Sequence, residues 1–183
     1  MSLVRILIVV VLQTVALGYM IIERQTMLNA AHTVTLKVVP VDPRDMFRGD
    51  YVILRYAISN LDLGKLQGDD KFDTSDTVFV TLEPEGTEWS AVAVARGRPF
   101  PTPRGTVIKG TVASVNGSSD SATSIGVDYG IESYYVPEGT GRAIENERQK
   151  GDLTADIAID NQGRAAIKAM RRGGQVFYVE GIF

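Results

Sequence analysis

The sequence contains no cysteine and a single histidine, His32. Without cysteine there is neither a disulfide framework nor a thiol nucleophile, and one histidine gives no convergent ligand set for zinc. A serine-histidine triad would have to use His32, which follows directly on the apolar N-terminus, so we reject it. No glycine-rich loop leads from a strand into a helix, so nucleotide binding has no support. We therefore expect neither a metal ion nor a cofactor.

Positive charge is not in excess either, since the formal net charge is -3 over 183 residues. Proteins that bind nucleic acid normally carry a basic face, so we expect no nucleic-acid partner. Acidic residues gather in "DDKFDTSD" at Asp69, Asp70, Asp73 and Asp76. Their spacing is not that of an EF-hand, and we interpret the segment as a solvated loop in preference to a calcium site.

Long apolar runs are absent except at the N-terminus. After Arg5 the sequence has no charged residue up to Ile22. At a rise of about 1.5 Å per residue, this run can cross a hydrocarbon core of about 30 Å, and it has no polar stripe of the kind a soluble helix shows. A cleaved signal peptide is the alternative, but "ERQTMLN" follows the run without a small-residue cleavage site. An uncleaved signal anchor is the preferred interpretation.

Arg5 and the free amino group are the only cations before the apolar run, so the N-terminus stays cytoplasmic under the positive-inside rule. The prediction is a cytoplasmic N-terminus (1–4), a transmembrane signal anchor (5–24), a juxtamembrane linker (25–32) and an extracytoplasmic β domain (33–183). The chain would then cross the inner (cytoplasmic) membrane once, with its C-terminal domain on the periplasmic side. Membrane lipid, contacted by the N-terminal helix, is the first expected partner.

From about residue 33 onward, alternation of apolar and polar residues predicts strands with turn residues between them. The predicted strands are 33–41, 51–58, 77–83, 89–96, 106–115, 124–130, 132–136, 153–160, 163–172 and 175–183. We expect a flexible polar loop at 116–123, a surface loop with one helical turn at 62–76, and one short surface helix at 139–151. The pattern predicts a mainly β fold, an antiparallel sandwich or partly closed barrel, preceded by one transmembrane helix.

The stretch "DPRDMFRGDYVILRY" (42–56) joins a charged turn to a strand. Strand parity divides its end into two faces. We predict that the face with Val52, Leu54 and Tyr56 packs into the core. The face with Tyr51, Ile53 and Arg55 is predicted to lie at a rim or against a partner.

Charges of alternating sign precede this strand at Arg44, Asp45, Arg48 and Asp50. One interpretation is a local network that holds the corner, in which each exposed pair contributes under about 1 kcal/mol. The other is that the two arginines form a fork for a carboxylate or a phosphate. We favour the structural interpretation and keep the second open.

The run "PVDPRDMFRGDYVILRY" (40–56), called here the first signature block, resembles the hallmark of the GDYXXLXY domain family. The pattern is met by Gly49, Asp50, Tyr51, Leu54 and Tyr56. A second signature block, "GIESYYVPEGTGRAIE" (130–145), is similar to the downstream signature of that family. In one interpretation of this block, Glu132 and Tyr135 face the arginine corner and form one polar site with it. In the other, the block is a strand end followed by a capped helix, and the sequence leaves the two open. The candidate binding residues are Arg44, Asp45, Arg48, Asp50, Tyr51, Arg55, Tyr56, Glu132, Tyr135 and Glu138.

The resemblance implies a membrane-anchored, extracytoplasmic bacterial protein that is often encoded beside a multi-pass membrane protein. It brings no reaction with it. We therefore expect a non-catalytic binding or accessory module that docks on a multi-pass membrane protein.

The alternative is a hydrolase or peptidase related to the signal peptidase barrel, which "FRGDYVILRY" also resembles. The serine-lysine dyad of those enzymes needs a Ser-Met pair ahead of this strand, and the matching place holds Pro43-Arg44-Asp45. The catalytic parts are therefore missing. A different centre would need Asp45 or Asp50 with a perturbed pKa.

Overall fold

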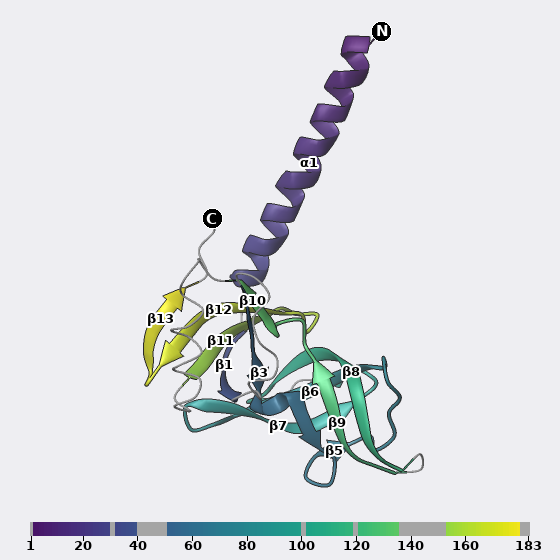
Figure 1. Ribbon diagram of the computed structural model, residues 1–183, viewed down its shortest axis with the longest axis vertical. Helices are drawn as coiled ribbons and strands as arrows, with labels where there is room; N and C mark the ends of the chain where they lie inside the picture. The colour runs from purple at the N-terminus through teal and green to yellow at the C-terminus, as the bar shows by residue number, and fades with distance from the viewer. Residues whose placement is uncertain are drawn as a thin grey trace.

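The computed structural model describes residues 2–29, 32–39, 51–99, 102–118, 121–135 and 153–179. One long helix, α1 (Ser2–Leu28), projects from a body built of strands (Figure 1). β1 (His32–Val39) begins shortly after the helix ends.

Helix α1 is apolar over most of its length, with charged residues near its two ends, and it contacts the body near its C-terminal end. The segment Leu3–Met27 has a mean hydropathy of 2.2 and is long and apolar enough to cross a membrane. Thr14, a polar residue within it, donates its hydroxyl hydrogen bond to the carbonyl of Val10 at 2.9 Å. This bond keeps the hydroxyl satisfied inside the helix, as a lipid environment requires. The helix continues through residues 25–28, which were predicted as the juxtamembrane linker. On which side of a membrane each predicted range lies stays a prediction.

The first large sheet has five strands in the order β13-β12-β11-β1-β3. Its later members are β3 (Arg55–Tyr56), β11 (Leu153–Ile159), β12 (Ala165–Arg172) and β13 (Gln175–Val179). Strand β1 pairs antiparallel with β11 from His32↔Ile159 to Lys37↔Thr154, so the first strand after the helix lies inside the sheet.

The second large sheet has six strands in the order β4-β9-β8-β6-β7-β5, and it curls into a half-barrel (Figure 1). Its strands are β4 (Asn60–Asp62), β5 (Gln67–Gly68), β6 (Thr77–Glu85), β7 (Glu88–Ala95), β8 (Thr106–Ser118) and β9 (Ser121–Asp128). All of its described pairs are antiparallel except β5 with β7.

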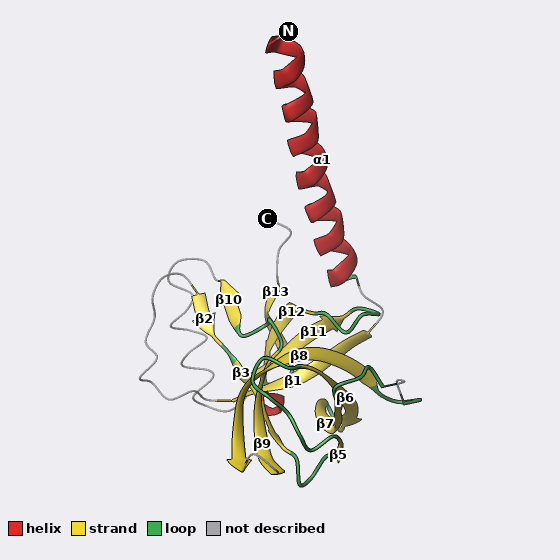
Figure 2. Ribbon diagram, turned by 90° about the vertical axis from the view of Figure 1, so that its right-hand side faces the viewer, coloured by secondary structure: helices red, strands yellow, loops and turns green. Residues whose placement is uncertain are grey.

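A separate two-stranded ribbon pairs β2 (Tyr51–Ile53) with β10 (Ser133–Tyr135). A single turn of 3₁₀ helix, η1 (Ala57–Ser59), follows β3. In Figure 2 the ribbon lies at the end of the body from which α1 leaves.

One hydrophobic core joins the sheets. Along β1 the apolar side chains Val34, Leu36 and Val38 are buried, as period-two alternation requires. Strand β11 is buried along almost its whole length, because it lies inside its sheet and faces the core. Tyr56 and Met170 are among the largest fully buried side chains.

The structure confirms the mainly β fold with two large sheets and an apolar N-terminal helix. Three local predictions were wrong. The single strand 51–58 is divided into β2, β3 and η1, because the chain changes pairing partner at Leu54. The loop 116–123 is largely strand, since β8 extends to Ser118 and β9 begins at Ser121.

The third correction concerns 62–76, which carries no helical turn. It contains β5 and turns, and Phe72 within it packs into the core. The helix predicted at 139–151 lies outside the described residues.

Candidate functional site

The two signature blocks, far apart in the sequence, lie side by side in the fold. The backbone of β2 from the first block pairs with that of β10 from the second, in the register Tyr51↔Tyr135, Val52↔Tyr134 and Ile53↔Ser133. The contact continues past the ribbon, where the Leu54 amide donates to the Glu132 carbonyl at 2.7 Å. We call β2 and β10 together the signature ribbon.

Two buried tyrosines connect the segments around the two blocks by hydrogen bonds inside the body. The hydroxyl of Tyr56 donates to the carbonyl of Ile131 at 2.8 Å, and the hydroxyl of Tyr129 donates to the carbonyl of Ile58 at 2.8 Å. The two bonds run in opposite directions between the segments 54–58 and 129–132. Burial, followed by the charge of Glu132, raises the pKa of Tyr129 well above its ordinary value, so this phenol remains a donor.

Glu132 has a local task. Its carboxylate Oε1 accepts a hydrogen bond of 2.6 Å from the Tyr129 amide and so closes the turn that leads into β10. Gly130 in this turn has φ +78°, a left-handed conformation that glycine adopts without strain. The arginine corner lies outside the described residues, so the interpretation in which Glu132 faces it stays a prediction.

The residues that name the GDYXXLXY pattern have different environments. Leu54 and Tyr56 are fully buried, as parity predicted, while Ile53 and Arg55, which alternate with them, are exposed. Tyr56 therefore belongs to the core and is removed from the set of residues that can touch a partner. Tyr51 and Tyr135 are placed by their backbone pairing alone. The remaining candidates, Arg44, Asp45, Arg48, Asp50 and Glu138, lie outside the described residues.

Two carboxylates of the acidic segment 69–76 accept hydrogen bonds from backbone amides of the body. Asp69 accepts from the Arg96 amide at 2.8 Å, and Asp76 accepts from the Asp73 amide at 2.9 Å. The Arg96 guanidinium lies 3.2 Å from Asp76 and stacks over the buried Phe72 ring at 5.7 Å. Across the described part of the chain, no three His, Cys, Asp or Glu side chains converge as metal ligands would.

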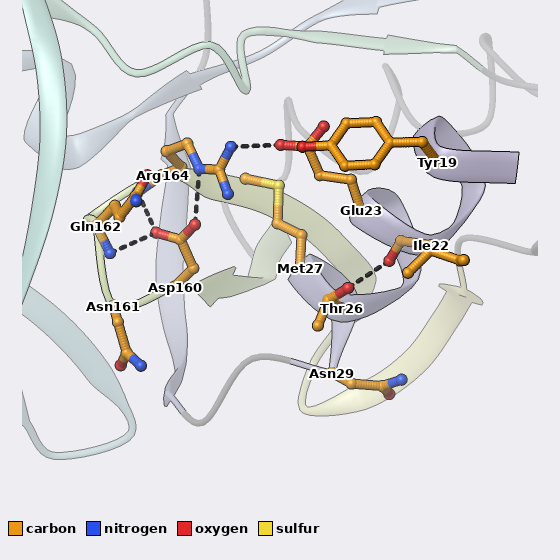
Figure 3. A pocket seen from close by; sticks show the side chains of 10 residues that line it. All are labelled: Tyr19, Ile22, Glu23, Thr26, Met27, Asn29, Asp160, Asn161, Gln162 and Arg164. Atoms are coloured by element: carbon orange, nitrogen blue, oxygen red, sulfur yellow. Dashed lines mark hydrogen bonds and ion pairs between the residues drawn. The ribbon is translucent and has the colours of Figure 1, made fainter. Parts of the chain in front are cut away.

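A second group of interest lies where α1 meets the body, and sequence reasoning missed it. Arg164, just after the β11–β12 turn, donates from Nη1 to Glu23 of α1 and from Nε to Asp160, each at 2.7 Å (Figure 3). We call Glu23, Asp160 and Arg164 the helix-base cluster. Glu23 and Arg164 are separated by 141 positions in the sequence, so no local pattern could have joined them. The only available signal was an acidic residue directly after the apolar run.

The β11–β12 turn is also tied to the rest of the body. The Gly163 carbonyl accepts from the Lys109 amide of β8 at 2.7 Å, and the Asn161 carbonyl accepts from the guanidinium of Arg98. The turn between two strands of one sheet thus contacts α1 and the second sheet.

Comparison with known proteins identifies the family of the chain. The model of one protein family, described as GDYXXLXY protein, matches residues 13–170. No curated protein and no solved structure matches the chain. The match includes part of α1, both signature blocks and most of the strands, and on this evidence the chain belongs to the GDYXXLXY protein family.

Proposed function

We propose that this protein is a membrane-anchored, extracytoplasmic accessory module that docks on a multi-pass membrane protein through its signature ribbon. The observation that carries the proposal is the pairing of the two family signature blocks at the end of the body nearest the anchor helix (Figure 2). A surface at that end is the one that a membrane-embedded partner can reach.

The anchor has its support in α1. Its span Leu3–Met27 covers 25 residues, and the side chains from Leu3 to Leu17 are exposed. At about 1.5 Å per residue the span is roughly 37 Å long, enough for a hydrocarbon core of about 30 Å. An exposed apolar surface of this length is unfavourable in water, and bilayer lipid would cover it. Arg5 on the N-terminal side favours the body outside the cytoplasm.

The contact surface has its support in strand parity. Leu54 and Tyr56 hold the first block in the core, and this directs Ile53 and Arg55 outward. Ile53 is 37% exposed and is one of two large apolar side chains in the described body that are exposed to this extent, together with Val176. An apolar residue next to a cation suits an interface with a protein, where arginine and apolar anchors contribute most of the binding energy.

Membrane insertion is tested first. Membranes from cells that express the full chain are washed with alkaline carbonate, and intact spheroplasts are treated with protease. The proposal expects the chain to stay in the carbonate pellet and the body to be digested from outside. Release by carbonate, or protection of the body in spheroplasts, would refute the anchor or its orientation.

Docking is tested by co-purification from detergent-solubilised membranes, with partners identified by mass spectrometry. We expect Ile53→Ser and Arg55→Ala, and in the same block Arg44→Ala and Tyr51→Ala, to reduce recovery of a multi-pass partner by roughly tenfold. Glu132→Ala is not a suitable test, because it removes the carboxylate that closes the turn before β10. Val176→Ser is the matched control, since it removes an exposed apolar side chain on β13. Equal recovery with all variants would refute docking through the ribbon.

The enzymatic alternative makes a different prediction. An active centre at Asp45 or Asp50 would give labelling by an activity-based probe that is lost in Asp45→Asn or Asp50→Asn. Docking expects no such labelling.

A further inference from the structure

A cavity of about 560 Å³ lies between the end of α1 and the β11–β12 turn (Figure 3). One wall comes from the helix, with Tyr19, Ile22 and Met27, and the other wall comes from the turn. The helix-base cluster lies across it. The cavity therefore has an apolar side that continues the exposed face of α1 and a charged side that belongs to the body.

The charged side is held in place before any ligand arrives. The Asp160 carboxylate accepts from the amides of Gln162 at 2.8 Å and Arg164 at 2.9 Å, and from Arg164 Nε at 2.7 Å. These bonds fix the direction of the guanidinium, whose Nη1 reaches Glu23. A group that is already oriented loses little conformational entropy on binding.

The cluster retains hydrogen-bonding capacity. A guanidinium has about five N–H donors, and two of those on Arg164 have partners among the described residues, through Nε and Nη1. The Arg164 side chain is 45% exposed. Two carboxylates and one guanidinium also leave the cluster with one negative charge in excess. A ligand that suits both properties carries a phosphate for the Nη2 donors of Arg164 and a cation for the Glu23 carboxylate.

The depth of the cavity in the membrane indicates where such a ligand comes from, and this step rests on the anchoring proposed above. About 20 apolar residues fill a hydrocarbon core. The uncharged run that follows Arg5 ends at Ile22, so Glu23 begins the headgroup layer. Lipid headgroups surround the cavity there at very high local concentration.

We propose that the helix-base cavity binds the headgroup of a zwitterionic phospholipid that bears a primary ammonium, as phosphatidylethanolamine does. The phosphate accepts from the Nη2 group of Arg164, and the ammonium donates to Glu23 Oε2, the carboxylate oxygen that Arg164 does not use. The acyl chains run along α1 past Tyr19 and Ile22. A primary ammonium donates hydrogen bonds to carboxylates, which a choline headgroup cannot do, and an anionic glycerol headgroup meets the excess negative charge.

The test uses the full chain in mixed micelles with equal amounts of phosphatidylethanolamine, phosphatidylglycerol and phosphatidylcholine, read by native mass spectrometry. We expect one retained lipid, with the ethanolamine class enriched roughly tenfold over each of the others. Arg164→Gln should lose this lipid. Lys168→Gln is the matched control, because Lys168 is an exposed cation on β12 that does not line the cavity.

A second variant separates recognition of the headgroup from damage to the turn. Glu23→Gln leaves the Asp160–Arg164 pair in place and removes the excess negative charge, so it should keep a bound lipid and shift the preference toward phosphatidylglycerol. Equal retention of the three classes by the wild type, or an unchanged preference in Glu23→Gln, would overturn the proposal. Flotation of the same protein with vesicles of the three lipids reports on anchoring alone. A chain that floats but retains the three lipids equally in the mass spectrum refutes the headgroup site, and one that fails to float refutes the anchor.

Discussion

The hydroxyl of Tyr56 donates a buried hydrogen bond of 2.8 Å to the carbonyl of Ile131, so a residue of the first signature block holds the backbone of the second. Tyr129 returns the same kind of bond to the carbonyl of Ile58. This exchange explains why the pattern ends in a tyrosine at position 56. Phenylalanine would fill the same space and leave a buried carbonyl with one partner fewer.

Tyr56→Phe should lower the free energy of unfolding by about 1–2 kcal/mol, because the Ile131 carbonyl loses a buried donor. The measurement is urea unfolding of the full chain in detergent, followed by tryptophan fluorescence. Tyr19→Phe is the control, since Tyr19 is exposed on α1. A Tyr56→Phe variant as stable as the Tyr19→Phe variant would contradict the assigned role.

Gly163→Ala tests the close approach of the β11–β12 turn to β8. Gly163 has φ +83°, and an added Cβ would lie 3.1 Å from the Lys109 amide nitrogen and 3.1 Å from the Val107 carbonyl oxygen. Gly86→Ala is the matched control, because Gly86 has φ +66° and open space around its Cβ position. Gly86→Ala should cost about 1 kcal/mol for the left-handed conformation alone, and Gly163→Ala should cost clearly more. Equal losses in thermal unfolding would mean that β8 moves away freely.

Asp160 should contribute a pH-dependent part of the stability. Burial acts to raise the pKa of this carboxyl, but hydrogen bonds from the Arg164 side chain and from the amides of Arg164 and Gln162 outweigh it and hold the pKa below its ordinary value. A group with a lowered pKa in the folded state stabilises the protein above its unfolded pKa of about 3.9, and this is lost as the pH falls through the folded value.

The corresponding measurement is the melting temperature of wild type and Asp160→Asn from neutral pH down to acid. The wild type should be the more stable at neutral pH, and the difference should shrink below about pH 4. Asp70→Asn, a change at an exposed carboxylate, controls for the loss of one surface charge. A difference that stays constant with pH would show that the Asp160 contribution is not electrostatic.

Asp156 should be coupled to Arg171 across β11 and β12. The carboxylate is 7% exposed, accepts from Arg171 Nε at 2.7 Å, and accepts from the Thr35 hydroxyl at 3.0 Å. Asp156→Ala should cost roughly 2–3 kcal/mol, because an arginine and a hydroxyl lose one shared acceptor. Arg171→Ala should cost at least as much, because it leaves the nearly buried Asp156 carboxylate without its guanidinium, whereas in Asp156→Ala the Arg171 side chain, 36% exposed, can be solvated by water.

A double-mutant cycle with both changes checks this relationship. We expect a coupling energy of about 1–2 kcal/mol in urea unfolding. Strict additivity of the two single variants would contradict the contact.

Local alternation in the sequence predicted most strands. A strand that is buried on one face alternates apolar and polar residues, and this pattern is visible without knowledge of the fold. It also assigned the correct faces around Leu54, with Tyr56 inside and Arg55 outside. It failed where the pairing partner changes, since β2 and β3 form one continuous pattern and yet belong to different sheets.

The prediction of a loop at 116–123 failed for another reason. Polar residues there pair with each other across the hairpin, as Thr123 does when its hydroxyl donates to the Asn116 carbonyl at 3.3 Å. Gly117, with φ +129°, absorbs an irregularity in the register. Composition alone marks such a segment as flexible, although its cross-strand partners keep it in the sheet.

The helix-base cluster could not be predicted, since ion pairs between distant segments leave no periodic trace. The meeting of the signature blocks was left open by the sequence and is settled by the β2–β10 register. That register could be found only from the fold.

The connection between α1 and β1 has a mechanical consequence. β1 pairs with β11 from His32 to Lys37 and with β3 at Val38 and Val39, so tension applied to α1 is passed to a strand that is paired along its whole length. A load along that strand has to shear the ladder from His32↔Ile159 to Lys37↔Thr154, whose bonds resist together and do not open one at a time. β1 is thus the strand through which any load on α1 enters the body.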